Sequence, residues 1–355
     1  MVLVIVRNKE AVVESYGETF PGSRRTPDSR SLVRLCSLSK VLASDLLLKL
    51  STEGKARLDD PLQRFAPPGK KVPQRAGASP ITLLDLATHT SGLPREVGPY
   101  PEQTPHFTFP DEKFRWTWLP GQKLLAAPGS AALYSNVGYD LLGDAIASAA
   151  GKTYAQLLNE RTVRPLGLRD TTLTPTREQC GRLLQPIKDE GPCSDTQASG
   201  ASGGVYSTAA DMVRLLQYFL QTPGAPAQPR SVFQVYREPA QLKSVHGLSH
   251  AGDPTGIGAG WIQLGDPESP SVLMEKTGGG AGFETYIALN LKRQTGVFLA
   301  ATDGKGAAHF NLFHDANDLL AELAGVPQLP AKVNKSRPVP RRKHHPVHNA
   351  ASKVQ

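Results

Sequence analysis

Residues 34–47 read RLCSLSKVLASDLL, a short polar stretch that leads into an apolar run. Ser37 and Lys40 stand three positions apart at the head of this run. If the run is a helix, both side chains lie on one face, one turn apart, and the amine can reach the proton of the serine hydroxyl. A Ser-x-x-Lys pair alone is a weak signal in a chain of this composition, so its meaning depends on the motifs that follow.

Two further short motifs follow the pair along the chain. Tyr134-Ser135-Asn136 comes first, and Lys276-Thr277-Gly278 later ends a strand-like run. In this order, the three motifs resemble those of serine β-lactamases and penicillin-binding proteins. The surrounding sequence strengthens the resemblance: LATHTSGLP from Leu86, PGSAALYSNVGYDLLG from Pro128, RPLGLRDT from Arg164 and SGGVYSTAADM from Ser202.

Up to about residue 325, the chain is similar to the class-C-like branch of this family. That branch includes bacterial class C β-lactamases, D-Ala-D-Ala peptidases, related esterases and the animal β-lactamase-like proteins. The resemblance implies an α+β fold, an α/β/α sandwich of the β-lactamase/transpeptidase type. Its antiparallel sheet is built from both chain ends, with flanking helices and an inserted, mostly helical subdomain.

Apolar patterning in the sequence agrees with this architecture. Strand-like runs lie near both ends of the chain, and helical runs with Pro/Gly loops lie between them. The expected strands are 2–6, 11–16, 260–264, 271–276, 283–291 and 297–301, and the expected closing helix is 309–324. We expect residues 1–60 and 230–325 to form the sheet domain, 61–229 the helical insert and 326–355 a disordered basic tail.

The net charge of +8 is concentrated at the C-terminal end. Residues 326–355 hold seven of the 40 lysines and arginines and no acidic residue, which leaves 33 basic against 32 acidic residues in 1–325. A nearly neutral body does not favour nucleic-acid binding. No apolar run reaches the ~18 uncharged residues of a membrane span, so neither a nucleic-acid partner nor a membrane span is predicted.

The N-terminal segment predicts a hairpin rather than a signal peptide. Five apolar residues separate Met1 from Arg7, fewer than the ~7 to 15 of a secretory core. Relatives in the resembled family carry a helix before this hairpin, so a truncated form or an alternative start is one interpretation. The compartment is left open.

The cysteines Cys36, Cys180 and Cys193 form neither a disulfide framework nor a zinc pattern. Cys180 and Cys193 are close enough in sequence to be bridged, but spacing alone does not decide it. Cys36 directly precedes the proposed nucleophile, which raises the alternative of a cysteine enzyme. A neighbouring residue on a helix points elsewhere, so we expect Cys36 to be a small buried side chain.

The motifs together predict nucleophilic catalysis by Ser37. Its hydroxyl would attack an acyl carbonyl and form an ester intermediate. Lys40 must be neutral to accept the proton, which requires burial and nearby positive charge, and Lys276 could supply that charge. Tyr134 could share the proton network and protonate the leaving group or activate water. The choice of principal base between Lys40 and Tyr134 stays open.

The remaining motif residues are candidates for substrate binding. The Asn136 amide could hold both the acyl carbonyl and the Lys40 head group. Lys276 and Thr277, followed by Gly278, would lie on a sheet edge and offer a cation and a hydroxyl to a substrate carboxylate. The resemblance implies that the backbone N–H groups of Ser37 and Gly279 form the oxyanion hole.

Two other patterns are weaker alternatives. Residues 200–204 read GASGG, a literal G-x-S-x-G around Ser202, but the strand that a nucleophile elbow requires does not precede it. The H-x-x-x-H pairs at 246/250 and 344/348 are interrupted by Gly247 and Pro346, so neither lies on a helix as a zinc motif would. We expect no metal and no organic cofactor, and we assign no catalytic role to His89.

The sequence therefore predicts a serine acyl-hydrolase, a β-lactamase-like amidase, peptidase or esterase, that acts on a small-molecule or peptide acyl substrate. The alternative is a catalytically retired fold that serves as a binding or self-assembling module. Asp45 favours this alternative modestly, because a carboxylate in an apolar helix needs a partner or a solvent-facing position. The substrate and the oligomeric state are left open.

Overall fold

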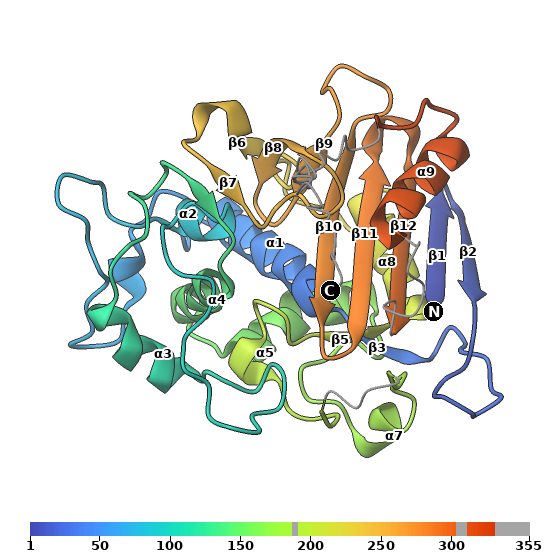
Figure 1. The fold of residues 1–355 in the computed structure, drawn as a ribbon, viewed down its shortest axis with the longest axis horizontal. Coiled ribbons are helices and arrows are strands. Elements are labelled where there is room, and N and C mark those ends of the chain that lie inside the picture. The colour runs from blue at the N-terminus through green and yellow to red at the C-terminus, as the bar shows by residue number, and fades with distance from the viewer. Residues whose placement is uncertain (187–190, 303–310, 331–355) are drawn as a thin grey trace, which may run out of the picture.

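The computed structural model describes residues 1–186, 191–302 and 311–330 (Figure 1). In this part of the chain, eight strands form one antiparallel sheet in the order β2-β1-β12-β11-β10-β9-β8-β6. The strands are β1 (Val2–Arg7), β2 (Glu10–Ser15), β6 (Val235–Arg237), β8 (Pro254–Gly258), β9 (Ile262–Leu264), β10 (Leu273–Gly280), β11 (Phe283–Asn290) and β12 (Thr295–Thr302). Two short pairs lie outside the sheet: β3 (Leu32–Arg34) with β5 (Tyr206–Thr208), and β4 (Ala132–Leu133) with β7 (Val245–His246).

Strands from the two ends of the chain lie side by side in the sheet. β1 pairs with β12, so that Val4 lies opposite Phe298. Along β1, Val2, Val4 and Val6 are fully buried while the residues between them are partly buried, the alternation expected of a strand with one face on the main core. The predicted antiparallel sheet built from both chain ends is confirmed.

Helices cover both faces of the sheet (Figure 1). Helix α9 (Leu312–Ala324) packs on β11 and β12, and its Ala316 and Leu320 are buried there. Helix α8 (Ala209–Phe219) lies on the opposite face, against β1 and β12. This is the expected α/β/α sandwich, in which each apolar helix face is buried against the sheet.

The helical part lies to one side of the sheet and is organised around α1 (Ser39–Thr52) (Figure 1). Leucines cover most of the circumference of α1, which is almost wholly buried and packs against α4 and α5. The other helices are α2 (Leu83–Ala87), α3 (Glu112–Trp118), α4 (Asn136–Ala150), α5 (Tyr154–Leu158), α6 (Arg164–Leu166) and α7 (Arg177–Cys180). Short 3-10 turns lie at Cys36–Leu38, Leu62–Phe65, Leu119–Gly121, Gln197–Ser199, Pro239–Gln241 and Leu291–Arg293, and a π turn at Asn159–Val163.

Asp45 has partners inside the fold. Its carboxylate is fully buried on α1, where Lys49 lies 2.7 Å from Oδ2 and the Tyr218 hydroxyl donates to Oδ1 at 2.8 Å. The charge that the sequence left unexplained is therefore paired and hydrogen-bonded, as a buried carboxylate must be.

Several predicted boundaries differ from the structure. β6 and β8 were not predicted, because both are short and follow loop-like sequence. Helix α8 falls within the range 61–229 yet packs on the sheet, and the division into a sheet domain and an insert stays a prediction. The expected closing helix begins at Leu312, and residues 309–310 and 331–355, including most of the expected disordered tail, lie outside the described residues. Of the helices that are described, none combines the length and apolarity that crossing a bilayer requires.

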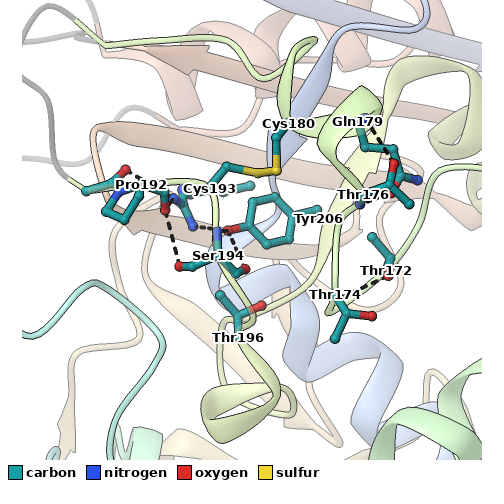
Figure 2. Close-up of a disulfide and its surroundings, with 12 residues drawn as sticks. Thr172, Thr174, Thr176, Gln179, Cys180, Pro192, Cys193, Ser194, Thr196 and Tyr206 are labelled. Carbon is teal, nitrogen blue, oxygen red and sulfur yellow. Dashed lines mark hydrogen bonds between the residues drawn. A yellow bond between two sulfur atoms is a disulfide. The ribbon is translucent and has the colours of Figure 1, made fainter.

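A disulfide joins Cys180 at the end of α7 to Cys193, with the two Cα atoms 5.7 Å apart (Figure 2). The Tyr206 hydroxyl donates to the Ser194 carbonyl at 3.2 Å beside it. Arg34 donates to the Tyr206 hydroxyl at 2.6 Å and to the Pro192 carbonyl at 2.7 Å. The bridged segment is thus fastened to β3. The third cysteine, Cys36, is free and buried, as predicted.

Candidate active site

The turn that carries Ser37 is held rigidly between the sheet and α1. Cys36 has a φ of 50°, a left-handed conformation that costs energy for a residue other than glycine. Three hydrogen bonds hold the turn: Thr285 Oγ1 to the Leu35 carbonyl at 2.9 Å, the Leu35 N–H to the Val205 carbonyl at 2.8 Å, and Ser39 Oγ to the Cys36 carbonyl at 2.8 Å. Ser37 is therefore presented from a fixed backbone.

Two of the predicted proton carriers reach the Ser37 hydroxyl directly. Tyr134 donates to Ser37 Oγ at 2.6 Å, and Lys40 Nζ lies 3.3 Å from the same atom. Tyr134 comes from the loop before α4, and Ser37 and Lys40 come from the entrance to α1. The fold thus brings together the three side chains that a serine nucleophile with a neighbouring base requires.

Lys40 is completely buried and has three oxygen partners. Besides Ser37, its Nζ donates to Asn136 Oδ1 at 2.6 Å and to the Ser202 carbonyl at 2.5 Å. Burial lowers the pKa of Lys40 to about 7; Arg95 adds to this effect, and Asp140 and Glu96 oppose it. Lys40 can therefore be neutral near neutral pH, as the mechanism requires. Burial and the Arg95 charge lower its pKa, rather than the Lys276 charge that the sequence suggested.

Cationic groups surround the Tyr134 ring. The Arg95 guanidinium lies 4.7 Å from the ring centroid, Lys40 Nζ 4.9 Å and Lys276 Nζ 5.4 Å. Such contacts are attractive, because the face of an aromatic ring is electronegative. They hold the ring with its hydroxyl toward Ser37.

His89 supports the Tyr134 loop from behind. Its ring stacks on that of Tyr134 with the centroids 4.4 Å apart, and its Nδ1 accepts the Ser135 N–H at 3.1 Å. Burial holds the pKa of His89 well below its usual value, so the ring is neutral and its nitrogen can accept this bond. His89 thus positions the motif without reaching the nucleophile.

Asn136 is the first residue of α4, and its amide is engaged on both sides. Oδ1 accepts from Lys40, while Nδ2 donates to Glu96 Oε1 at 2.5 Å. The side chain therefore holds Lys40 as predicted. Contact with an acyl carbonyl would require Nδ2 to share or exchange its Glu96 partner.

The Lys276 motif lies on β10, which is an interior strand rather than the edge strand predicted from sequence. β9 pairs only with residues 273–275 of β10, so residues 276–280 extend beyond it and pair with β11 alone. An edge is thus exposed locally, facing the Ser37 turn. Lys276 is buried, which lowers its pKa, and its Nζ donates to the Thr277 carbonyl at 2.8 Å.

A cavity of about 210 Å³ lies beside the Ser37 turn, Tyr134 and the Lys276 motif of β10. Its lining includes Ser37, Tyr134, Thr277, Gly278 and Gly279. An acyl group in this cavity would have the nucleophile on one side and the backbone of β10 on the other. The structure therefore gathers all the sequence-predicted residues around one centre, with Lys40 and Asn136 behind Ser37.

Four residues at this centre were not predicted: Arg95, Glu96, Asp140 and Ser202. Asp140 had a detectable signal, because it lies four positions after Asn136 and so shares its helix face. Ser202 acts through its backbone carbonyl, for which a side-chain pattern carries no information. The G-x-S-x-G segment thus contacts the site without supplying a nucleophile.

A protein-family model for Beta-lactamase matches residues 1–321 of the sequence. The chain belongs to the β-lactamase family. The D-alanyl-D-alanine-carboxypeptidase/endopeptidase AmpH of Escherichia coli K12 is 42% identical over 328 residues, covering 92% of this chain and 85% of AmpH. With such a relative, this β-lactamase-family chain is a serine hydrolase.

Solved structures agree with this assignment. A β-lactamase/D-alanine carboxypeptidase from Yersinia pestis, complexed with citrate, superposes with a TM-score of 0.86 at 41% identity and covers 91% of this chain and 92% of its own. A class C β-lactamase in complex with cefoxitin superposes with a TM-score of 0.71 at 20% identity, over 90% of this chain and 92% of its own. The latter likeness shows the shared fold.

Proposed function

We propose that this β-lactamase-family chain is a D-alanyl-D-alanine carboxypeptidase that works through an acyl-enzyme on Ser37. The observation that carries the proposal is the position of Ser37 Oγ, 2.6 Å from the Tyr134 hydroxyl and 3.3 Å from Lys40 Nζ. The substrate class is supported by the names of the Escherichia coli and Yersinia pestis relatives, which are more than 40% identical to this chain.

The contacts of Lys40 fit the role of first base. A neutral amine has two hydrogens and one lone pair. The two shortest contacts, to Asn136 and to the Ser202 carbonyl, use the two hydrogens, and the lone pair then faces the Ser37 hydroxyl. With a pKa of about 7, a substantial fraction of Lys40 is neutral at neutral pH. This amine can take the Ser37 proton as the serine oxygen attacks the acyl carbonyl.

The leaving group needs a proton when the carbon–nitrogen bond breaks. Tyr134 is placed to donate one, because its hydroxyl already points at Ser37 Oγ. Lys40 keeps the proton that it took from Ser37 while the ester exists, and Tyr134 is a phenolate at that stage. In the second half of the reaction, water attacks the ester carbonyl, gives its proton to the same network, and restores the Ser37 hydroxyl.

The substrate would lie along residues 276–280 of β10. The N–H groups of Ser37 and Gly279 are the proposed oxyanion donors, worth ~3 kcal/mol each in transition-state stabilisation. Lys276 and Thr277, together with Arg95 at the cavity wall, would attract the terminal carboxylate of the peptide. Attraction of that carboxylate would favour carboxypeptidase over general esterase activity.

The test is release of D-alanine from an acyl-D-Ala-D-Ala peptide, measured by liquid chromatography with mass spectrometry. We expect release by the wild type, none by Ser37→Ala, and near wild-type release by Ser202→Ala, which keeps the backbone carbonyl that Lys40 uses. Equal release by wild type and Ser37→Ala would contradict the mechanism. No release by any form would favour the retired binding module.

A further inference from the structure

The segment 94–96 lies along the start of α4 and is bonded to it through the backbone. The Pro94 carbonyl accepts from the Ser135 hydroxyl at 2.7 Å. The Arg95 carbonyl accepts from the Asn136 N–H at 2.8 Å. The next side chain of the segment is therefore fixed beside the Asn136 amide.

That side chain is the Glu96 carboxylate, and donors meet both of its oxygens. Oε1 accepts from Asn136 Nδ2 at 2.5 Å and lies 3.6 Å from Arg95 Nε. Oε2 accepts from the Tyr100 hydroxyl at 3.0 Å. An ionised carboxylate can only accept hydrogen bonds, so the oxygen beside Asn136 requires a donor from that amide.

The Asn136 amide has two orientations, because a half-turn about its last side-chain bond exchanges Oδ1 and Nδ2. In the structure, Oδ1 accepts from Lys40 Nζ at 2.6 Å and Nδ2 donates to Glu96. After a half-turn, Oδ1 would face the Glu96 carboxylate with no hydrogen between the two oxygens. That exchange loses a charge-assisted hydrogen bond and sets two acceptors against each other. Glu96 therefore selects the observed orientation.

The orientation of this amide decides what the neutral Lys40 amine does with its lone pair. With Oδ1 toward it, Lys40 donates one hydrogen to Asn136 and the other to the Ser202 carbonyl, and the lone pair is left for Ser37. With Nδ2 toward it, the amide would offer a hydrogen, and the lone pair could accept that hydrogen instead of the Ser37 proton. The charged ammonium has no lone pair, so this competition arises only in the neutral form that reacts.

We propose that Glu96 is a positioning residue, which holds the Asn136 amide with Oδ1 toward Lys40 and so keeps the Lys40 lone pair directed at Ser37. Among the described residues, Glu96 reaches Lys40 by hydrogen bonds only through Asn136. The inference rests on the proposed acyl-enzyme mechanism and adds a residue that its first step needs.

Glu96 also acts on Lys40 through its charge. The groups around the Lys40 amine are two carboxylates, two cations, a thiol, an imidazole and two phenols: Glu96, Asp140, Arg95, Lys276, Cys36, His89, Tyr134 and Tyr139. Burial lowers the pKa of Lys40, and the two carboxylates oppose this effect. Loss of the Glu96 charge must therefore lower the pKa of Lys40 further, and this effect has to be measured apart from positioning.

The pH profile of acylation separates the two effects. Stopped flow gives the second-order rate constant with a fluorescent penicillin that does not titrate between pH 5 and 9. The midpoint of the profile reports the pKa of Lys40, and the upper plateau reports the rate with Lys40 neutral. Glu96→Gln and Glu96→Met have side chains of similar length. Glutamine keeps an oxygen acceptor, which the Arg95 guanidinium draws toward Asn136, and methionine removes it.

Both variants should move the midpoint to lower pH, by roughly half a pH unit or more, because each removes a negative charge that raises the pKa of Lys40. Glu96→Gln should keep the plateau within about twofold of the wild type, whereas Glu96→Met should lower it about tenfold or more, as expected for a lost charge-assisted hydrogen bond. Glu102→Gln is the control. It removes a negative charge from an exposed position of the same loop and should change neither quantity.

Equal plateaus for the wild type and folded Glu96→Met would overturn the inference, as would equal plateau losses in Glu96→Gln and Glu96→Met. Glu96→Ala takes the place of the methionine variant if that variant fails to fold. A midpoint that stays in place in both variants would also overturn the inference, because Glu96 would then not lie beside the base.

The wild type distinguishes this inference from the function on which it rests. Absence of acylation of the wild type at every pH would overturn the proposed function and the inference together. Acylation of the wild type with equal plateaus in all variants would overturn the inference alone.

Discussion

The Tyr134 hydroxyl donates to Ser37 Oγ at 2.6 Å, although the two residues are 97 positions apart in the chain. Ser37 comes from the entrance to α1 and Tyr134 from the entrance to α4. Because α1 and α4 pack against each other, the packing of the two helices fixes this contact. The geometry of the nucleophile therefore depends on the helical core as well as on the motifs.

Replacing Tyr134 by phenylalanine should separate the role of the hydroxyl from that of the ring. Tyr134→Phe keeps the ring and its contacts with Arg95 and Lys276, and removes only the proton carrier. We expect acylation by a fluorescent penicillin to slow by roughly 10²- to 10⁴-fold, the usual contribution of a general acid–base group. The melting temperature should change little, and an unchanged acylation rate would exclude Tyr134 from the mechanism.

The pKa of Lys40 predicts the pH dependence of acylation. Lys40 must be neutral to accept a proton, and burial lowers its pKa to about 7. The acylation rate should therefore rise as the pH increases from 6 to 8 and level off above that range. Stopped-flow measurement with a probe that does not titrate between pH 5 and 9 checks this. A flat or falling profile would exclude Lys40 as the base.

Gly278 and Gly279 form a matched pair for testing the contact between β10 and the nucleophile turn. A Cβ at Gly278 would lie 2.2 Å from Thr285 Oγ1 and 2.9 Å from the Leu35 carbonyl, whereas one at Gly279 would meet nothing closer than 3.9 Å. We expect Gly278→Ala to lower the free energy of unfolding by about 1–3 kcal/mol and Gly279→Ala to leave it nearly unchanged. Urea denaturation of both variants measures this, and equal losses would contradict the placement of β10.

The Cys180–Cys193 disulfide should contribute to stability. It closes a loop with a sequence separation of 13, and a loop of this size loses chain entropy in the unfolded state worth on the order of 3 kcal/mol. The double variant Cys180→Ser/Cys193→Ser should show a correspondingly lower free energy of unfolding. Cys36→Ser is the control for loss of a thiol. Free thiols at both positions in the purified wild type, found by alkylation and mass spectrometry, would contradict the bridge.

The sequence predicted the sheet and the active-site motifs because both leave local signals. The strands near the chain ends have strong apolar patterns, and Ser37, Tyr134 and Lys276 are parts of short motifs with ordered spacing. β6 and β8 lacked such patterns, and their pairing depends on the neighbours that the fold supplies.

The groups that shift the pKa of Lys40 and hold its amine could not be predicted in the same way. Asp140 and Glu96 act through burial and charge, which depend on contacts between distant segments. The Ser202 carbonyl is a backbone group that any residue could provide. The interior position of β10 also required knowledge of strand order, since its free edge exists only because β9 is short.

The most direct test of the central claim is the intact mass of the protein after exposure to benzylpenicillin. We predict a covalent adduct on the wild type and on Ser202→Ala, and none on Ser37→Ala, with peptide mapping that places the adduct on Ser37. An adduct that persists on Ser37→Ala, or that maps to Cys36 or Ser202, would contradict the assignment of Ser37 as the nucleophile.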